Sequence, residues 1–422
     1  MTKRRSLCEW LDYQQQLHPT EIELGLERLR KVWKRLHPGQ YKPLIISVAG
    51  TNGKGSCVAY LHAILRAASW RVGSYTSPHL IRYNERIRID DEEVSDDELC
   101  MAFERIEKCR GEITLTYFEF GALAALDLFS RHQLDVVVLE VGLGGRLDAV
   151  NLMDADAALV TSIGIDHVAW LGDSRDAIGA EKAGILRAHQ PAVYAEADMP
   201  AGFLQTAGAI GAQLYHLGDD YHYTIGEDAW SWRCDAAQYQ ALPLPSMRGD
   251  YQIQNAAGVL MVLQLLREQL PVSRKALEQG LIQTNLPGRF QIIASDPLII
   301  LDVAHNQEAA TVLAANLGSM QLHGKLRALF SMYADKPLQA VVATLENVVS
   351  EWYLYPLDDE RGCSVEELSA AVLQAGGDAE VNCSDSLKNA LQDAKQASEA
   401  GDVILIFGSF GVVGEALEMM LL

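Results

Sequence analysis

Gly50-Thr51-Asn52-Gly53-Lys54-Gly55-Ser56 is the stretch of sequence on which the fold assignment depends. It follows the apolar, β-branched run 44–49 and precedes a helical pattern over 56–68, so it predicts a strand, a glycine-rich turn and a helix. Such a turn points several backbone N–H groups inward, and the helix N-terminus adds partial positive charge, which together bind phosphate. Gly55 separates Lys54 from Ser56, so the loop departs from the strict G-x-x-x-x-G-K-S/T pattern. The strand and helix on either side still favour a phosphate site over a tight turn alone.

Further strand patterns alternate with helical ones on both sides of this loop. Nearly continuous apolar runs at 71–76, 135–141 and 157–163 predict strands buried on both faces, which is typical of a parallel sheet. The alternation restarts after Leu286-Pro287-Gly288-Arg289, and the strands predicted there are 297–303, 326–332, 351–355 and 402–407. We therefore predict an α/β protein with domains at 1–290 and 297–422 and a linker at about 291–296.

Two segments depart from the strand–helix alternation. Residues 20–36 carry apolar side chains at helical spacing, with Thr20 and Glu23 placed as a capping box, and predict an amphipathic helix. Between about 219 and 247 the pattern breaks into short Tyr- and Trp-rich pieces, which predict a small antiparallel excursion or an extended loop. A helix over 253–268 is predicted to follow.

The composition narrows the range of partners and locations. The seven cysteines are scattered without a Cys-x-x-Cys pair, which argues against a disulfide framework or zinc site and favours a cytoplasmic location. The formal net charge of −21 argues against a nucleic-acid partner, because duplex binding depends on lysine and arginine contacts with phosphates. No apolar run reaches the roughly 18 residues of a membrane-spanning helix, and no secretion signal is visible. Anionic substrates must therefore be held by local devices such as helix N-termini, magnesium and a few cations.

Motifs around the loop point to one family. The loop is accompanied, in order, by Ser77-Pro-His-Leu80, Thr116-Tyr-Phe-Glu119, Leu139-Glu-Val-Gly-Leu-Gly-Gly-Arg-Leu-Asp148, Asp166-His167, Glu181-Lys-Ala-Gly184, Leu286-Pro-Gly-Arg-Phe290 and Asp302-Val-Ala-His-Asn306. Together these motifs resemble the Mur ligase superfamily and, within it, the bacterial bifunctional dihydrofolate synthase/folylpolyglutamate synthase family. The match runs from about residue 10 to the C-terminus, and the combination is far more specific than any single motif.

The resemblance implies a fold and a reaction. The fold would be an N-terminal P-loop-type domain with a mainly parallel sheet flanked by helices, followed by a smaller C-terminal Rossmann-like α/β domain with glutamate ligase function, the active site lying in the interdomain cleft. The reaction would be ATP- and Mg²⁺-dependent formation of an amide between L-glutamate and dihydropteroate or a reduced folate, through an acyl phosphate. Because water would destroy the acyl phosphate, the site is expected to close before chemistry. The partners would be these small molecules only, and the protein a monomer.

The resemblance also assigns residues to ATP. They are the loop residues Gly50, Thr51, Asn52, Gly53, Lys54, Gly55 and Ser56, together with Asn255, Arg289, Asp302 and His305. As isolated residues, the last four would each be given a structural role: Asn255 as a helix cap, and Arg289 as a brace at the domain junction. Only the matched motifs reverse that interpretation.

Ser77, Glu140 and His167 map to magnesium ligands, with two ions expected. Glu140 ends an apolar strand at the edge of the sheet where loops gather, although such a carboxylate alone is also typical of a solvated strand end. Magnesium is not the preferred metal of a histidine. Lys182 is implied to be catalytic with Lys54, Glu140 and His167, as a lysine carbamylated by CO₂. Its sequence context alone favours an ordinary surface lysine beside Glu181.

The pterin side rests on the resemblance as well. The implied contacts are Glu23, Leu24, Gly25 and Leu26; Thr116, Tyr117, Phe118 and Glu119; and Leu147, Asp148 and Ala149. Phe118 is suited to stacking on a pterin ring, although an aromatic residue at the start of a helix is commonly part of the core.

Two other functions remain open at this stage. A Mur-type ligase acting on a UDP-muramyl precursor would share the loop and the 302–306 motif, but has no need of 116–119 or 24–28. A nucleotide-dependent switch or binding module belongs to another class, and would be expected to carry a strict Walker loop and no second large domain.

Overall fold

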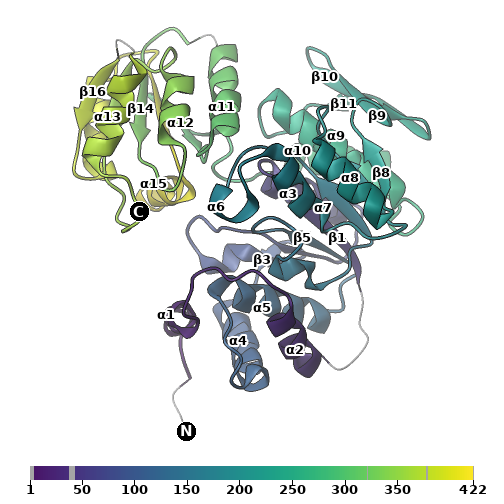
Figure 1. The fold of residues 1–422 in the computed structure, drawn as a ribbon. Coiled ribbons are helices and arrows are strands. Elements are labelled where there is room, and N and C mark those ends of the chain that lie inside the picture. Colours follow the sequence, from purple (N-terminus) through teal and green to yellow (C-terminus); the bar gives the residue numbers. More distant parts are fainter. Residues whose placement is uncertain (1–3, 38–42, 321, 377–378, 422) are drawn as a thin grey trace. The chain divides into compact units, whose positions relative to one another are not determined.

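The chain divides into two units, each with its own sheet. The computed structural model describes residues 4–37, 43–320, 322–376 and 379–421, and Figure 1 shows their path. One unit comprises Met1–Ser246 and Gln252–Thr284, and the other comprises Met247–Tyr251 and Asn285–Leu422. Among the helices in the described ranges, none combines the length and apolar character needed to cross a bilayer.

The first unit is built on an eight-stranded sheet of order β4-β3-β2-β5-β1-β6-β7-β8. From β2 to β8 all neighbours in this order are parallel, while β3 and β4 are added antiparallel at one edge. The strands are β1 (Leu44–Ala49), β2 (Val72–Tyr75), β3 (Ile87–Ile89), β4 (Glu92–Glu93), β5 (Val136–Glu140), β6 (Ala157–Val160), β7 (Pro191–Tyr194) and β8 (Gln213–His216). The central strands β1, β5 and β6 are buried almost throughout, as their continuous apolar runs predict.

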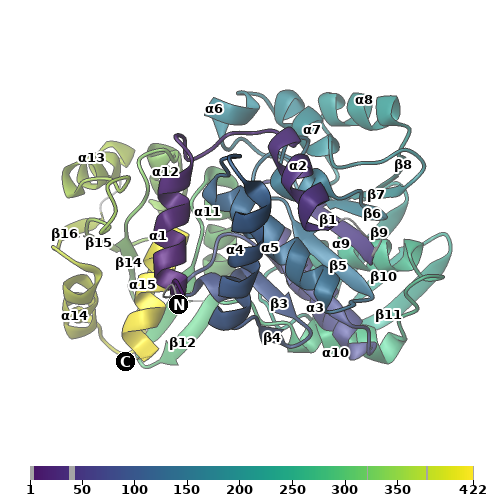
Figure 2. The same cartoon turned by 90° about the horizontal axis from the view of Figure 1, so that it is seen from below.

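Helices cover both faces of this sheet. Figure 2 shows α2, α4 and α5 nearest the viewer, and in Figure 1 α3 and α10 lie on the opposite face. The helices of this unit are α1 (Leu7–Leu17), α2 (Glu27–Leu36), α3 (Lys54–Ala67), α4 (Asp96–Arg110), α5 (Tyr117–Arg131), α6 (Val168–Leu171), α7 (Arg175–Ala183), α8 (Ala201–Ile210), α9 (Asp250–Leu265) and α10 (Arg274–Gln283), with short 3₁₀ turns η1 (Tyr83–Arg86) and η2 (Ala149–Leu152). Helix α5 begins with a capping box between Thr116 and Glu119.

The Tyr- and Trp-rich segment forms a separate three-stranded antiparallel sheet. Its strands are β9 (Tyr221–Ile225), β10 (Ala229–Cys234) and β11 (Ala237–Pro243). Trp230 and Trp232 are buried, so this sheet has its own apolar side. The predicted antiparallel excursion is confirmed.

The helix predicted over 20–36 is wrong in its first turns. Helix α2 begins only at Glu27, and its N-cap, Leu26, makes no side-chain capping bond. Gly25 has φ 154°, a conformation no helix contains, and Glu23 pairs with Arg28 and His18 instead of closing a capping box on Thr20. The ion pairs of Glu23 with His18 and Arg28, together with the bond from Gly25 N to Leu147 O, therefore replace the predicted capping box.

The second unit is a smaller α/β unit with a six-stranded sheet of order β12-β13-β17-β14-β15-β16. Only β12 is antiparallel to its neighbour. The elements are β12 (Gln291–Ser295), β13 (Leu298–Asp302), α11 (Gln307–Ser319), β14 (Leu326–Phe330), α12 (Leu338–Leu345), β15 (Glu351–Leu354), α13 (Val365–Ala375), β16 (Glu380–Cys383), α14 (Leu387–Ala397), β17 (Val403–Phe407) and α15 (Phe410–Leu421). The predicted α/β class of both units is confirmed.

The segment predicted as a linker, 291–296, is not free of structure. Residues 291–295 form β12, which pairs with β13 through Gln291↔Leu301 and Ile292↔Ile300. The short turn at Asp296-Pro297 joins two adjacent strands, so the polar, proline-containing signal marks a hairpin inside the second unit.

Candidate active site

The glycine-rich loop joins β1 to α3 and opens onto the helix N-terminus. Gly50 has φ 152° and Gly53 has φ 84°, so both adopt backbone conformations that side chains resist. A Cβ at Gly50 would lie 1.8 Å from Thr161 Oγ1, which means that only glycine fits there. Ser56 is buried in the first turn of α3. The geometry is that of an anion-binding turn.

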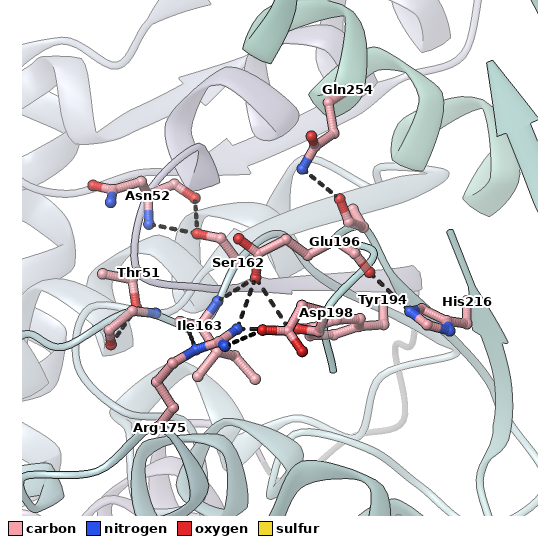
Figure 3. Close-up of polar contacts among 12 residues, drawn as sticks. Thr51, Asn52, Ser162, Ile163, Arg175, Tyr194, Glu196, Asp198, His216 and Gln254 are labelled. Carbon is pink, nitrogen blue, oxygen red and sulfur yellow. Dashed lines mark hydrogen bonds and ion pairs between the residues drawn. The ribbon is translucent and has the colours of Figure 1, made fainter. Parts of the chain in front are cut away.

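The segment after β6 holds this loop in place (Figure 3). Thr51 N donates to Ser162 O at 2.8 Å, and Thr51 Oγ1 both donates to Gly164 O and accepts from Gly164 N. Asn52 N donates to Ser162 Oγ at 3.1 Å, and Asn52 O accepts from Thr161 Oγ1 at 2.5 Å. The loop is therefore preformed by a neighbouring strand exit as well as by its own glycines.

Two lysine amines converge on the same loop. Lys54 Nζ donates to Gly50 O at 3.1 Å and to Thr51 O at 3.0 Å. Lys182 Nζ also donates to Gly50 O, at 2.9 Å, although it comes from α7. The interpretation of Lys182 as a surface lysine is wrong, because Lys182 is only 4% exposed. Burial, followed by repulsion from Lys54, lowers the pKa of Lys182 to about 7.

The metal candidate Ser77 follows β2, and the metal candidate Glu140 is the last residue of the neighbouring parallel strand β5. Glu140 is 4% exposed, and one of its carboxylate oxygens accepts from Ser77 N at 3.2 Å. A buried carboxylate beside a serine at the carboxyl edge of the sheet is an oxygen donor set that suits Mg²⁺.

His167 is placed differently from the other metal candidates. It lies in the left-handed region with φ 53° as the N-cap of α6, and its side chain is 39% exposed. Its Nε2 lies 3.9 Å from a carboxylate oxygen of Asp166. Among the described residues no three His, Cys, Asp or Glu side chains cluster as a metal site. Any ion bound here would take only part of its coordination from these side chains, and Mg²⁺ commonly keeps water and phosphate oxygens for the rest.

The segments predicted for the pterin come together around Arg28. This guanidinium donates to Glu119 Oε1 at 2.8 Å and pairs with Glu23. Gly25 N donates to Leu147 O at 3.3 Å, which ties the first segment to the third. The predicted site residues 23–26 omit Arg28, which lies two residues beyond them; no local signal singles it out, because Arg30 and Lys31 follow closely.

Phe118 and Asp148 connect these segments to the glycine-rich turn after β5. A Cβ at Gly142 would lie 2.4 Å from the Phe118 ring, so the ring packs directly on that turn. Asp148 accepts from Leu143 N at 2.8 Å and from Val150 N at 3.0 Å. Burial raises the pKa of Asp148 to about 6, opposed by these hydrogen bonds and by Lys54. Asp148 thus organises the turn itself.

Asn255 lies inside α9, near the start of α3. It is 1% exposed, and its side-chain amide donates to Gln252 Oε1 at 3.2 Å. Its carbonyl oxygen lies 3.8 Å from Cys57 Sγ, one residue beyond the phosphate loop. The structure therefore brings Asn255 beside the loop helix rather than to a helix end, and the helix-cap interpretation is wrong.

In the second unit, Arg289, Asp302 and His305 gather at the end of β13. Asp302 accepts from Phe290 N and from Ala304 N, both at 2.8 Å, and its burial raises its pKa. The Arg289 guanidinium lies 5.1 Å from the ring centre of Phe410, and the His305 ring lies 6.0 Å from it. Sequence reasoning missed Phe410, which opens α15 directly after the last strand.

Comparisons with known proteins agree on one family. A Mur ligase middle domain model matches residues 48–263, and a Mur ligase, glutamate ligase domain model matches residues 288–410. A relative from Escherichia coli (strain K12), named dihydrofolate synthase/folylpolyglutamate synthase, is 42% identical over 414 residues, covering 98% of this chain and 95% of the relative. A relative of the same name from Haemophilus influenzae is 37% identical, and the match covers 97% of this chain and 96% of that relative.

Solved structures give the same result. E. coli FolC in complex with DHPP and ADP has a TM-score of 0.94 at 41% identity, covering 99% of this chain and 98% of that one. A bifunctional folylpolyglutamate synthase/dihydrofolate synthase with Mn, AMPPNP and L-glutamate bound has a TM-score of 0.92 at 43% identity, with full coverage of both chains.

Proposed function

The chain belongs to the dihydrofolate synthase/folylpolyglutamate synthase family of Mur ligases, and from this premise we propose how its residues carry out the reaction. It is an ATP- and divalent-metal-dependent ligase that adds L-glutamate to dihydropteroate and to reduced folates. The observation that carries the residue-level proposal is the convergence of Lys54 and Lys182 on the carbonyl of Gly50, in a loop shaped for anions.

We assign the phosphates of ATP to the loop 50–56. A substrate carboxylate oxygen attacks the γ-phosphorus and ADP leaves, which gives an acyl phosphate. The glutamate amine then attacks the acyl carbon, loses a proton, and phosphate departs as the C–O bond breaks. Lys54 supplies positive charge where negative oxygens accumulate, and the N-terminus of α3 binds them without rearranging. Mg²⁺, held by Ser77, Glu140 and His167, would neutralise phosphate charge when bound.

Lys182 is proposed to work as a carbamate. Its neutral amine attacks CO₂ and loses one proton, which converts a cation into an anion beside the loop. The lowered pKa supports this role, because only the neutral amine is a nucleophile. Conversion also removes the repulsion between two ammonium groups that share one carbonyl.

Substrate positions follow the residue clusters. We propose that segments 23–26, 116–119 and 147–149 bind the pterin, supported by the bonds that join them through Arg28 and Leu147. Asn255, and in the second unit Arg289, Asp302 and His305, are proposed to contact ATP. The proposed functional domains are an ATP- and pterin-binding domain at 1–290 and a glutamate ligase domain at 297–422.

One assay separates this function from its rivals. Purified protein with Mg²⁺ and ATP is tested for ADP release with dihydropteroate, tetrahydrofolate or a UDP-muramyl precursor, with and without L-glutamate. We expect release only with a pteridine substrate and glutamate together, and its loss in Lys54→Ala by about 100-fold or more. Release with the muramyl precursor, or release indifferent to glutamate, would refute the proposal, as would full activity of Lys54→Ala.

The wider setting is also part of the proposal. We propose a monomer that works in the cytoplasm on small molecules, with no nucleic-acid or membrane partner. The negative net charge supports the absence of nucleic acid, and all seven cysteines are unpaired in the structure. Light scattering tests the monomer, and fractionation of cells tests the location.

A further inference from the structure

The exit of β6 supports the phosphate loop, and it is itself held by side chains from two other elements. Figure 3 shows Ile163 between Arg175 and Glu196. Ile163 N donates to Glu196 Oε2 at 3.2 Å, and Ile163 O accepts from Arg175 Nε at 2.7 Å. Residues 161–164 have left the sheet, so these backbone groups depend on side chains for hydrogen bonds.

Arg175 and Glu196 also bind each other. Arg175 Nη2 lies 3.6 Å from Glu196 Oε2, so the two side chains close a ring around the peptide of Ile163. Arg175 is the first residue of α7, the helix that carries Lys182. Glu196 comes two residues after β7. The ring therefore joins two neighbouring strand exits to the helix that supplies the second lysine of the site.

Further bonds hold Glu196 in place. Tyr194 Oη donates to Glu196 Oε2 at 3.1 Å, and His216 Nε2 lies 2.9 Å from the Glu196 carbonyl oxygen. Gln254 Nε2 donates to the carbonyl of the preceding residue, Ala195, at 2.8 Å. Gln254 directly precedes Asn255, so the same strand exit is connected to α9.

A plain surface ion pair is the competing interpretation. The Arg175 and Glu196 side chains are 37% and 31% exposed, and pairs of that kind contribute little on their own. The outer partner, Asp198, fits this description, since its side chain is 83% exposed and pairs with Arg175, and its carbonyl oxygen accepts from Tyr194 Oη. Glu196 differs, because its carboxylate accepts a charge-assisted hydrogen bond from a backbone N–H. That N–H lies one residue from Ser162, which binds the loop.

We infer that Arg175 and Glu196 are positioning residues for ATP binding. They fix residues 161–164, and residues 161–164 in turn fix the phosphate loop. The inference rests on the proposed function of that loop. Neither side chain contacts the loop, and both act through Ile163. The consequence is selective: ATP binding should weaken, while binding of the pterin substrate should not.

The test measures steady-state kinetics and ADP affinity in the full-length protein. We expect Glu196→Ala to raise both KM for ATP and Kd for ADP by about tenfold, the usual scale for losing a charge-assisted bond. KM for dihydropteroate should stay within about twofold. Glu196→Gln should recover most of the ATP affinity, because its amide oxygen still accepts from Ile163 N.

Controls distinguish positioning from general stabilisation. Asp198→Asn removes the exposed partner and should leave KM for ATP unchanged. Arg175→Ala should raise KM for ATP about as much as Glu196→Ala does. In the double variant KM for ATP should rise by less than the product of the two single effects, since both side chains act on the same residue. If Glu196→Ala fails to fold, Arg175→Lys makes the same test, because lysine keeps the charge but not the guanidinium fork.

The inference is overturned if Glu196→Ala keeps wild-type KM for ATP, or if KM for ATP and for dihydropteroate rise together. A wild-type protein that neither binds ADP nor turns over dihydropteroate would instead overturn the proposed function. The two failures are therefore distinguishable in one set of measurements.

Discussion

At the scale of single residues, the chemistry of the candidate site depends on charged side chains that are shielded from water. Lys54 and Lys182 both donate to Gly50 O, and Asp148 lies near enough to Lys54 to feel its charge. Two nearby ammonium groups repel each other, and burial penalises the charge of Lys182. Both effects lower the pKa of Lys182, which is only 4% exposed.

This predicts a pH-dependent capture of CO₂ by Lys182. For an amine with a pKa near 7, the neutral, reactive fraction rises as pH increases through that value, and at pH 6 only about a tenth is neutral. Protein incubated with ¹³C-bicarbonate should therefore show a carbamate carbon signal at pH 8.5 that is much weaker at pH 6. Carbon-13 NMR makes the measurement.

Lys182→Arg is the control for that experiment, because arginine stays protonated and cannot form the carbamate. Its spectrum should lack the signal while the fold is retained. A signal of equal size in Lys182→Arg, or none in the wild type at pH 8.5, would contradict the assignment.

At the scale of elements, the phosphate loop depends on how closely two strand exits approach. Gly50→Ala would place a Cβ 1.8 Å from Thr161 Oγ1 and force residues 161–162 away. We expect ADP affinity to fall by at least about tenfold, since the turn that leads into the N-terminus of α3 loses its arrangement. Isothermal calorimetry measures the effect.

Gly208→Ala supplies the matched glycine control. Gly208 lies within α8, and a Cβ there meets nothing within 4 Å. That variant should bind ADP as the wild type does, and should gain roughly 0.5–1 kcal/mol in stability from helix propensity. Equal losses of affinity in both variants would mean that Gly50 has no special role.

The entry to α2 makes a second prediction at this scale. Arg28 joins Glu23 and Glu119, so Arg28→Ala should loosen the pterin segments and leave the phosphate loop intact. KM for dihydropteroate should rise by about tenfold, with KM for ATP little changed. Arg30→Ala, an exposed position on the same helix, is the control and should change neither value. A rise in KM for ATP alone would contradict the proposed pterin site.

Elements with a strong local signal could be predicted from the sequence. The β1–loop–α3 unit and the β5 and β6 strands follow from apolar runs and the glycine-rich turn, and the structure has them. Strands β7 and β16 did not stand out, because they are short and owe their strand state to pairing with neighbours. The predicted start of α2 is wrong because Gly25 binds Leu147 and Arg28 binds Glu119, two distant partners that the local sequence cannot reveal.

The site shows the same division. Gly50, Lys54 and Glu140 could be predicted because strand ends and glycine turns mark where a parallel sheet binds ligands. The burial of Lys182 and the supporting bonds from Thr161 and Ser162 could not, since they depend on which strand lies beside β1. The local context of Lys182 suggested a surface position, whereas the structure buries this residue beside the phosphate loop, next to the segment to which the family resemblance assigns it.

At the scale of the whole molecule, each unit has its own apolar core. One core is formed around β1, β5 and α5, and the other around β14, β15 and β17. Each unit also carries its own buried charge network. In the second unit Arg327 donates to Glu351 Oε2 at 2.8 Å and pairs with Asp402, and all three residues are buried. A substitution that breaks this network should therefore destabilise the core of the second unit before that of the first.

Arg327→Met tests that independence. Removing one partner of a buried ion pair leaves uncompensated charge and typically costs about 3–5 kcal/mol. Here that charge falls on Asp402, just before β17, while Glu351 in β15 keeps its pair with Lys325. Native-state hydrogen exchange should show faster exchange in β13, β14 and β17, with the amides of β1, β5 and β6 protected as in the wild type. Lys388→Met, an exposed change on α14, is the control and should leave both sheets unaffected. Equal acceleration in the two sheets would mean that the units unfold as one, because a local loss would then have reached a core that Arg327 does not contact.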